Sequence, residues 1–512
     1  APVRSRVTTL AQPYQHVSQE LCVKVSGMGT DAPLITQVVD GADSEDYLSL
    51  RRLATPRAER FKLGKALRHK VPRRALAEWS APANRPDPID LIRFSHIGRV
   101  EHLIPTRVAR MIGSPYGFLR GTAVVMADDV AYLPSTGITP VVCGDSHLGN
   151  FGFYASPEGE LVIDRNDFDE AHPGAWEWDL RRLVAAIHVA GRENNATEEQ
   201  CDEAVRACVR AYRDHVRYLA DQPLLARSYS RMDAERLSDS AGNTGLKAEI
   251  ERAAKRARTR TSDRALPRFT HEHQGRRRIV DEPPLIVHVD DREYDAIAAG
   301  LDDYLQTLAP HWRRAIGGYH LIDIAHKVVG VGSVGLGAYV ALLEGSSPSD
   351  MVFLQLKQAR RSVLAPYVHG ERAWHKHQGQ RVVEYQQALQ TVSDPLLGWT
   401  TIDDRQYYVR QFRNMKGTVP LDAIDANALS DYAGIVGRLL GKGHSRTSGA
   451  SMIAGYLGKS DAVADALVTF ARLYADQTEA DHARSVQAVR RGDLPCDPTA
   501  LENRASAFLP GA

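Results

Sequence analysis

Cysteine is scarce in this sequence, and the few cysteines form no pattern. The chain of 512 residues has five, at scattered positions: Cys22, Cys143, Cys201, Cys208 and Cys496. An odd number without a CxxC pair argues against a disulfide framework and against a zinc site built on thiolates. We therefore expect reduced thiols.

Long apolar runs and an excess of one charge are also missing. The 64 lysines and arginines nearly balance the 63 aspartates and glutamates, which leaves a formal net charge of +1 at pH 7. Such a balance argues against a general polyanion binder. No run reaches the roughly 20 apolar residues of a membrane span, and the N-terminal APVRSRVTTL lacks the apolar core of a signal peptide. We expect a cytoplasmic protein with neither nucleic-acid nor membrane partners, and no feature specifies its oligomeric state.

The most basic segment, residues 251–278, has too few aromatic residues to bind a nucleic-acid strand by stacking. Phe269 is the one aromatic residue in it. Base stacking needs several aromatic platforms along a positively charged groove. A solvated helical excursion is the expected structure of this segment.

Acidic and amide side chains are concentrated between short apolar runs in residues 141–180. Asp145 follows the apolar pair Val141–Val142, and Asn150 comes five residues later. A second apolar run, residues 161–163, precedes three further acids: Asp164, Asp167 and Asp169. Carboxylate and amide oxygens from adjacent loops are the ligands that Mg²⁺ prefers, and Mg²⁺ usually shares them with a phosphate. The stretch therefore predicts phosphoryl transfer.

Phosphoryl transfer needs few protein groups, and this stretch offers two of them, a base and a metal site. We expect Asp145 to orient and deprotonate an acceptor hydroxyl, with His147 shaping the loop around it. Asn150 is one expected Mg²⁺ ligand, and either Asp167 or Asp164 is the other.

The order of these residues resembles the catalytic and metal loops of aminoglycoside and choline kinases, the small-molecule branch of the protein-kinase-like fold. The shared pattern is Gly-Asp-x-His-x-x-Asn, a strand, Asp-aromatic, and a Trp-x-Trp-Asp-Leu helix start. In these kinases the metal-loop Asp and a later Asp-Leu have about the spacing of Asp167 and Asp179, which implies that Asp167 is the principal metal ligand. The resemblance also implies that ATP and Mg²⁺ are the cofactors. Asp179, in the first turn of a predicted helix, is expected to brace the catalytic loop. The sequence departs from the family at Cys143, where histidine is usual, and at Asp169, where protein kinases have glycine. Neither change removes a ligand.

A glycine-rich segment precedes a predicted β-hairpin in residues 326–359. The GxGxxG pattern spans residues 330–335, and the runs AYVALLEG and MVFLQLK follow it on either side of the turn SSPSD. A hairpin leaves no room for the crossover helix of a dinucleotide-binding fold, whereas a glycine-rich hairpin over phosphates is the arrangement of kinases. Four residues of this segment are expected to contact the nucleotide: Gly330, Gly332, Ser333 and Gly335.

Lys357 is the expected partner of the nucleotide phosphates. The period of two along a strand turns it, with Phe353 and Gln355, away from the opposite apolar face and into a cleft. The predicted helix GQRVVEYQQALQ offers Glu384 as the anion that holds Lys357, with Glu371 as the alternative. Two further predicted strands lead into RNMKGT, the expected hinge beside adenine, and the residues assigned there are Arg413 and Met415.

The motifs stand in the reverse of the usual kinase order, with the catalytic loops before the glycine loop and lysine. A circular permutation explains this order, because domain termini often lie close together at the surface. The predicted fold is α+β, a two-lobed, circularly permuted protein-kinase-like fold. Its expected parts are an N-terminal extension (1–55), a helical catalytic lobe (56–310), a small β-rich nucleotide lobe (311–418) and returning helices (419–512).

Four runs also resemble a bacterial family of unknown function, DUF2252, that is suspected of being kinase-like: SPYGFLRG, GDSHLGNFG, NDFDE and VVGVGSVG. The resemblance covers roughly residues 55–485. Together the motifs predict an ATP- and Mg²⁺-dependent phosphotransferase acting on an unidentified hydroxyl-bearing substrate, a small molecule rather than a protein.

Other interpretations stay open. The acids could form an ion-pair network that braces loops while the glycines only make turns. The same fold also supports a nucleotide-binding pseudokinase or scaffold, or an adenylyltransferase that transfers AMP. A metal hydrolase would explain the Asp, Asn and His cluster but leaves the glycine hairpin and Lys357 without a role.

Overall fold

The computed structural model describes residues 54–273, 275–283, 285–328, 334–368 and 375–499. All of them belong to one compact unit, Gln37–Ala512. Helices and antiparallel sheets are both present, which confirms the predicted α+β class. Among the described residues, no helix is both long and apolar enough to cross a membrane.

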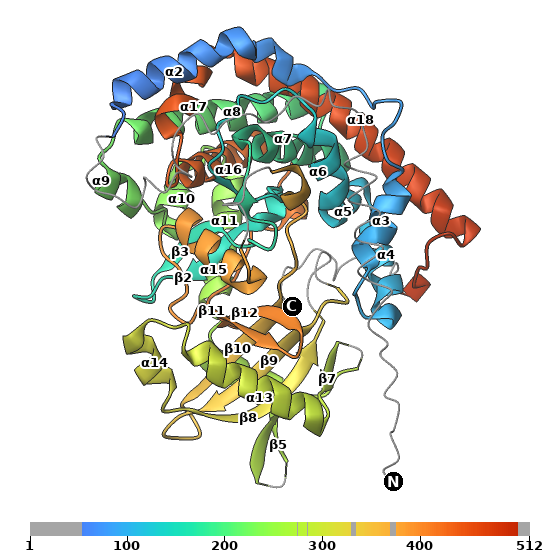
Figure 1. The fold of residues 1–512 in the computed structure, drawn as a ribbon, viewed down its shortest axis with the longest axis vertical. Helices are drawn as coiled ribbons and strands as arrows, with labels where there is room; N and C mark the ends of the chain where they lie inside the picture. The colour runs from blue at the N-terminus through green and yellow to red at the C-terminus, as the bar shows by residue number, and fades with distance from the viewer. Residues whose placement is uncertain (1–53, 274, 284, 329–333, 369–374, 500–512) are drawn as a thin grey trace, which may run out of the picture. The chain divides into compact units, whose positions relative to one another are not determined.

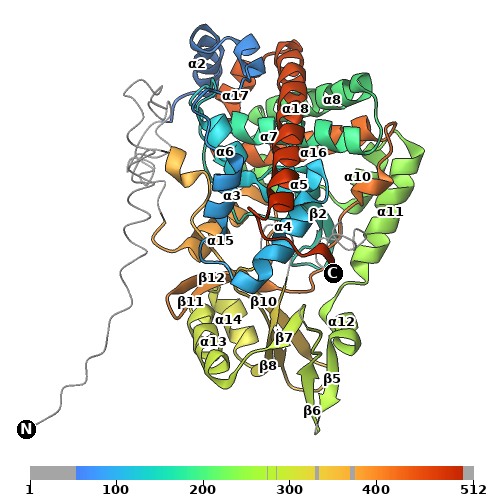
Figure 2. The same cartoon turned by 90° about the vertical axis from the view of Figure 1, so that its right-hand side faces the viewer.

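One group of helices is built from the two ends of the described chain (Figures 1 and 2). Its N-terminal members are α2 (Arg57–Lys70), α3 (Pro88–His96), α4 (Ile104–Ile112), α5 (Pro115–Gly121) and α6 (Ala123–Ala131). Its central members are α7 (Trp176–Glu193) and α8 (Glu198–Ala220). Its C-terminal members are α16 (Leu429–His444), α17 (Ala450–Leu457) and α18 (Ala462–Arg491). Helix α2 packs against α17, so segments almost 400 residues apart meet.

A six-stranded antiparallel sheet forms the second group of elements (Figure 1). In chain order its strands are β7 (Ile286–His288), β8 (His320–Lys327), β9 (Ala338–Glu344), β10 (Met351–Gln358), β11 (Gly398–Ile402) and β12 (Arg405–Gln411). Their order in the sheet is β11-β12-β10-β9-β8-β7. Helix α13 (Asp291–Leu305) covers one face, where Ile297, Leu301 and Tyr304 share a core with Leu354 and Leu356. The predicted hairpin and the predicted alternation along β10 are both confirmed.

The sheet begins before residue 311, where the sequence placed the start of the small lobe. Strand β7 pairs with β8, and α13 also belongs to the sheet through its core contacts. A strand of three residues has no periodicity of its own, so its place in the sheet is set by pairing that the local sequence does not encode.

The basic segment 251–278 is not a solvated excursion. It contains the end of α11 (Thr244–Arg258), then α12 (Ser262–Phe269), and a hairpin of β5 (Thr270–His273) with β6 (Arg276–Ile279). Leu266 and Phe269 are buried and pack with Phe353 and Phe412 of the sheet region. Between the charged residues of this segment, apolar residues form a stripe that covers the second face of the sheet.

Short elements connect the helices to the sheet, and Figure 1 shows β2, β3 and α15 between the two groups. They are the pair β1 (Val141–Val142) with β4 (His172–Pro173), the hairpin β2 (Phe151–Ala155) with β3 (Leu161–Arg165), and α15 (Gln378–Leu389). The remaining helices are α9 (Leu224–Tyr229), α10 (Ala234–Ser240) and α14 (Pro310–Ile316).

Helix α16 lies so close to α8 that its glycines differ sharply in what they tolerate. A Cβ atom built on Gly437 would be 2.2 Å from the carbonyl oxygen of Cys208, whereas one built on Gly434 would be 3.9 Å from that of Ala207. The approach of two helix backbones at Gly437 therefore requires the absence of a side chain.

We expect Gly437→Ala to lower the free energy of unfolding by about 1–3 kcal/mol, because the added methyl group forces α16 away from α8. Gly434→Ala is the matched control and should be neutral or stabilise by up to about 1 kcal/mol through helix propensity. Urea denaturation of the two variants checks this, and equal stabilities would contradict the close approach.

Candidate functional site

A buried carboxylate of α7 holds the turn that carries Asp145. Asp179, in the first turn of α7, accepts the backbone N–H groups of Cys143 at 2.7 Å and Gly144 at 2.9 Å. His444 at the end of α16 contacts the same carboxylate, with Nε2 3.1 Å from Oδ2. Gly144 has φ of +77°, a conformation that favours glycine. The expected bracing role of Asp179 is confirmed.

Asp145 itself is tied to α7 by one side of its carboxylate. Arg182 Nε donates to Asp145 Oδ1 at 2.5 Å, while Arg182 Nη2 donates to the carbonyl oxygen of Leu119 at 2.8 Å. Burial raises the pKa of Asp145, and the adjacent Arg182 guanidinium opposes that rise. Oδ2 faces His147, whose Nε2 lies 3.8 Å away. One carboxylate oxygen is thus fixed, and the other is the one available for chemistry.

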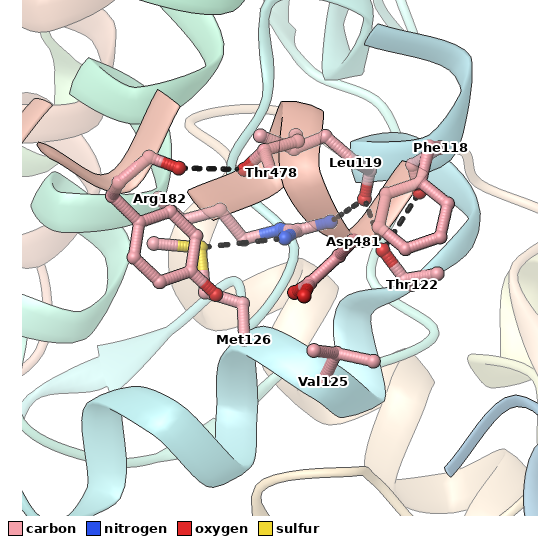
Figure 3. Close-up of a pocket in the computed structure, with 9 residues that line it drawn as sticks. Phe118, Leu119, Thr122, Val125, Met126, Arg182, Thr478 and Asp481 are labelled. Carbon is pink, nitrogen blue, oxygen red and sulfur yellow. Dashed lines mark hydrogen bonds between the residues drawn. The ribbon is translucent and has the colours of Figure 1, made fainter. Parts of the chain in front are cut away.

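A small cavity borders Arg182 and shows how the guanidinium is held (Figure 3). The side chain spans from the Leu119 carbonyl oxygen to Met126, with Nη1 3.5 Å from the sulfur. Nine residues line the cavity: Phe118, Leu119, Thr122, Val125, Met126, Arg182, Tyr474, Thr478 and Asp481. The Thr122 and Thr478 hydroxyls donate to carbonyl oxygens of their own helices. We therefore assign this cavity to packing behind Arg182 and not to a substrate.

His147 shapes the loop. It is 3% exposed, and its Nδ1 accepts the backbone N–H of Gly149 at 3.1 Å. Burial lowers the pKa of His147 well below the usual value, and the charges of Arg120 and Arg182 lower it further. The ring is therefore neutral, with its proton on Nε2, and it caps the 3₁₀ turn Leu148–Asn150.

Asn150 is positioned as a metal ligand would be. Its Nδ2 donates to the backbone carbonyl oxygen of Asp145 at 2.8 Å, and its backbone carbonyl oxygen accepts the N–H of Asn166 at 3.1 Å. The two bonds place Asn150 between the turn that carries Asp145 and the loop that follows β3. Its Oδ1 accepts no hydrogen bond from the described residues and is free to bind a cation.

Lys357 reaches the acidic loop, as expected from its place on β10. Its Nζ donates to Asp169 Oδ2 at 2.9 Å, and the Tyr408 hydroxyl donates to Asp169 Oδ1 at 2.7 Å. Burial opposes ionisation of both partners, but their mutual attraction lowers the pKa of Asp169 and raises that of Lys357. Lys357 also lies over the Tyr408 ring, 5.2 Å from its centroid. The pair is ionised and nearly enclosed.

Asp167 differs from its neighbour because no described residue forms an ion pair with it. Its Oδ1 accepts only the N–H of Asp169, at 3.2 Å. Burial raises the pKa of Asp167, and the charge of Asp169 raises it further. The charges of Lys357 and Arg410 oppose this rise, and the backbone bond from Asn166 to Asn150 connects the loop of Asp167 to Asn150. A divalent cation would further neutralise such a carboxylate.

Asp164, the alternative metal ligand, is committed elsewhere. Its Oδ2 accepts Lys442 Nζ at 2.5 Å, and its Oδ1 accepts the backbone N–H of Arg165 at 3.0 Å. The side chain is 1% exposed. Asp164 thus anchors α16 through a buried ion pair, which argues against it as the metal ligand, and the assignment of Asp167 stays a prediction.

Glu384 is not the partner of Lys357, which corrects a second prediction. Its carboxylate binds His375 Nε2 at 2.7 Å and Gln380 Nε2 at 2.7 Å at the protein surface. The residue of α15 that faces the acidic loop is Arg381, which donates to the carbonyl oxygens of Asp169 at 2.7 Å and Ala171 at 2.5 Å. Glu384 is one turn further along α15 than Arg381, and its side chain is exposed and contacts His375 and Gln380 instead of the loop.

The predicted hinge is only partly available to a base. The Arg413 guanidinium lies over Phe269 and Phe412, 4.6 and 4.9 Å from the ring centroids. The backbone N–H of Met415 donates to the Arg260 carbonyl at 2.8 Å. These internal contacts occupy the Arg413 side chain and the Met415 N–H, and the contact of the hinge backbone with adenine stays a prediction.

Part of the glycine segment lies outside the described residues. This applies to Gly330, Gly332, Ser333 and the alternative partner Glu371. Gly335 is described, with φ of +83°. Its carbonyl oxygen accepts the N–H of Val100 at 2.7 Å, so the end of this segment is anchored to the connection between α3 and α4.

Sequence reasoning missed several charged residues around the acids. Arg410 lies over the Tyr408 ring and, like Lys357, lowers the pKa of Asp167. Lys416 is half-buried nearby, and burial lowers its pKa well below the usual value. Arg182 and Arg381 were also missed. The signal for them in the sequence was an arginine within an apolar helical stripe, since a buried cation needs a specific partner.

The arrangement does not include a fully protein-ligated metal site. Among the described residues, no group of three or more His, Cys, Asp or Glu side chains is arranged to hold a metal ion. Asn150 and Asp167 fit an ion that keeps water and phosphate ligands, as Mg²⁺ does.

We expect stability to fall as the pH drops from 7 to 5, partly through His444. Burial lowers the pKa of folded His444, although Asp179 opposes this. Below the ordinary histidine pKa of about 6.5, unfolded His444 takes up a proton that the folded residue does not, so acid favours unfolding. His444→Gln should flatten this dependence in urea denaturation at both pH values, whereas the exposed His102→Gln should not. A His444→Gln curve as steep as that of the wild type would contradict the assignment.

Comparison with known proteins places the chain among uncharacterised relatives. A family model described as "Uncharacterized protein conserved in bacteria (DUF2252)" matches residues 99–488, more than half of the chain. This match confirms the family resemblance of the four sequence runs. The searches of curated proteins and of solved structures returned no match.

Proposed function

The chain belongs to this bacterial family, DUF2252, and we propose that it is an ATP- and Mg²⁺-dependent phosphotransferase acting on the hydroxyl group of a small molecule. The cofactors, the cytoplasmic location and the two-lobed kinase-like arrangement are parts of the same proposal.

The observation that carries the proposal is the meeting of Lys357 with the acidic loop. The two partners of this ion pair, Lys357 and Asp169, are 188 positions apart in the sequence and 2.9 Å apart in space. Among the described residues, no ion pair forms with Asp167, two residues from Asp169, and no hydrogen bond is donated to Asn150 Oδ1. A cation suited to phosphates thus lies near Asp167, and Asn150 offers a second oxygen from the connected loop, which is the minimum set for phosphoryl transfer. A network built only to brace loops would not leave Asp167 unpaired.

Each residue has a defined part in the transfer. Asp145 Oδ2 takes the proton of the acceptor hydroxyl while the acceptor oxygen forms a bond to the γ-phosphorus of ATP. The bond from that phosphorus to the β,γ-bridging oxygen breaks, and ADP leaves with the electron pair. Lys357 holds the phosphates in place, and Arg182 keeps Asp145 oriented. Mg²⁺ held by Asn150 and Asp167 supplies neutralisation of the phosphate charge.

The contacts at the end of α16 support a circular permutation. In kinases a long helix leads directly into the catalytic loop. Here Val141, at the start of β1, donates its N–H to Thr447 Oγ1 at 3.1 Å although 306 positions separate them. Three residues before Thr447, His444 contacts the brace Asp179. The end of α16 therefore lies beside the start of the catalytic segment, as it would if the two were continuous in an unpermuted chain.

A nucleotide-binding protein without phosphotransfer is the second candidate. The contact of 2.5 Å between Arg182 and Asp145 favours it, because a strong ion pair weakens a carboxylate as a base. The two candidates share nucleotide binding and differ in turnover, so they are separated by two measurements.

The first measurement is nucleotide-dependent stabilisation. We expect ATP with Mg²⁺ at a hundred times its Kd to stabilise the protein by about 2.7 kcal/mol, seen as a rise in Tm. Lys357→Ala should lose most of this rise relative to its own Tm without nucleotide, because the phosphates lose their cation. Glu384→Gln is the matched control and should keep the full rise, since its carboxylate lies at the surface. A rise that survives in Lys357→Ala would contradict the shared site.

The second measurement is turnover in Asp145→Asn. We expect a loss of about 10²- to 10⁴-fold, the usual effect of removing a positioned general base. The assay follows label transfer from ATP to a mixture of small hydroxyl compounds. Transfer of a γ-phosphate label supports the phosphotransferase, whereas transfer of an α-phosphate label would indicate an adenylyltransferase. Binding of ATP without either transfer would favour the pseudokinase.

A further inference from the structure

Three arginines lie close together beside the acidic loop. We call Arg99, Arg107 and Arg360 the arginine cluster. Arg99 Nε and Arg360 Nη1 both donate to the carbonyl oxygen of Ser95 near the end of α3, at 2.9 and 3.2 Å. Among the described residues, no Asp or Glu forms an ion pair with any of the three.

Arg107 is the most enclosed member of the arginine cluster. It is 2% exposed, and its Nε has no hydrogen-bond partner in the described part of the chain. Its Nη2 donates to the Gly121 carbonyl at 2.9 Å, and its Nη1 lies 2.9 Å from His96 Nε2. Burial lowers the pKa of His96 to about 4, so this histidine is a neutral acceptor and adds no negative charge. A buried donor without a partner is costly to keep unless a ligand completes it.

The cluster is electrostatically strained as it stands. Burial lowers the pKa of Arg99 to about 8, and repulsion by Arg107 and Arg360 contributes to this. Burial likewise lowers the pKa of Arg107 to about 10, with Arg360 adding to the effect. Nearby Glu170 only partly offsets the positive charge. A bound anion would reduce the repulsion among the three guanidinium groups and would accept a hydrogen bond from Arg107 Nε.

The arginine cluster is connected to the proposed catalytic residues through backbone contacts. Arg381 Nη2 donates to the carbonyl oxygens of Asp169 at 2.7 Å and of Arg360 at 2.9 Å. Arg99 Nη1 donates to the carbonyl oxygen of Val334 at 2.7 Å, at the described end of the glycine segment. The cluster therefore lies at the border between the acidic loop and the segment expected to cover phosphates.

The geometry points to an oxyanion-binding subsite in which Arg99, Arg107 and Arg360 hold a phosphate or carboxylate group of the acceptor. This inference rests on the proposed phosphotransferase function. Guanidinium groups favour such ligands, because their planar N–H forks match the oxygens of phosphate and carboxylate. We assign the anion to the acceptor and not to the nucleotide, because Lys357 is already the expected cation for the nucleotide phosphates.

Inorganic phosphate is the probe for this subsite. We expect saturable binding to the wild-type protein by calorimetry, and a further increase in Tm when phosphate is added to protein saturated with ATP and Mg²⁺. The double variant Arg99→Gln/Arg360→Gln should weaken phosphate binding by about tenfold or more, because charged hydrogen bonds are lost. Both residues are partly exposed, so the variant avoids the buried Arg107. Arg93→Gln is the matched control on α3 and should bind phosphate as the wild type does.

The outcomes separate this inference from the proposed function. Phosphate binding lost in the double variant but kept in Lys357→Ala supports the subsite, and it does so even if ATP fails to stabilise the wild type, in which case only the phosphotransferase is overturned. Phosphate binding lost in Lys357→Ala but kept in the double variant places the ion in the nucleotide site and overturns the subsite. The absence of phosphate binding to the wild type also overturns it.

Discussion

The ion pair between Lys357 and Asp169 is the contact on which the rest of the arrangement depends. Two opposite charges removed from water stabilise a fold only when their remaining hydrogen-bonding groups are satisfied. Tyr408 supplies that for the carboxylate, and Arg381 fixes the backbone of the same residue. The six-stranded sheet and the acidic loops are thereby connected at one point. Without this pair, Asp167 would be one of several acids in a loop and not an unpaired carboxylate beside a cation.

The acids around the site fall into two groups: those whose carboxylates are bound by other residues of the fold, and those whose carboxylates make few such contacts. Asp179 and Asp164 are fully occupied by backbone N–H groups, His444 and Lys442. Asp145 is half occupied, because Arg182 binds one oxygen. Asp167 is the least occupied of the set. The proposed chemistry follows this order, since a carboxylate can act on a substrate or metal only to the extent that the protein leaves it free.

Local pattern explains what could be predicted from the sequence. Alternation along β10 placed Lys357 on the face opposite Leu354 and Leu356, which lie in the core under α13. The errors concern pairings that local periodicity does not determine. Glu384 lies on a helix that was correctly predicted, but Arg381, one turn earlier on α15, contacts the loop instead. The residues alone left Asp164 and Asp167 as alternatives, and in the structure the distant Lys442 pairs with Asp164 and distinguishes the two.

The order of the chain has a consequence for how the protein is made. Asp169 leaves the ribosome 188 residues before the lysine that neutralises it. At about 5–20 residues per second, synthesis of that interval takes roughly 10–40 s. During this time the nascent acidic loop has its braces on α7 but neither its counter-charge nor α16, whose His444 and Lys442 emerge later still. The carboxylates of the acidic loop must therefore stay hydrated, and the helical segment must stay able to pack against the sheet, until the sheet has been translated.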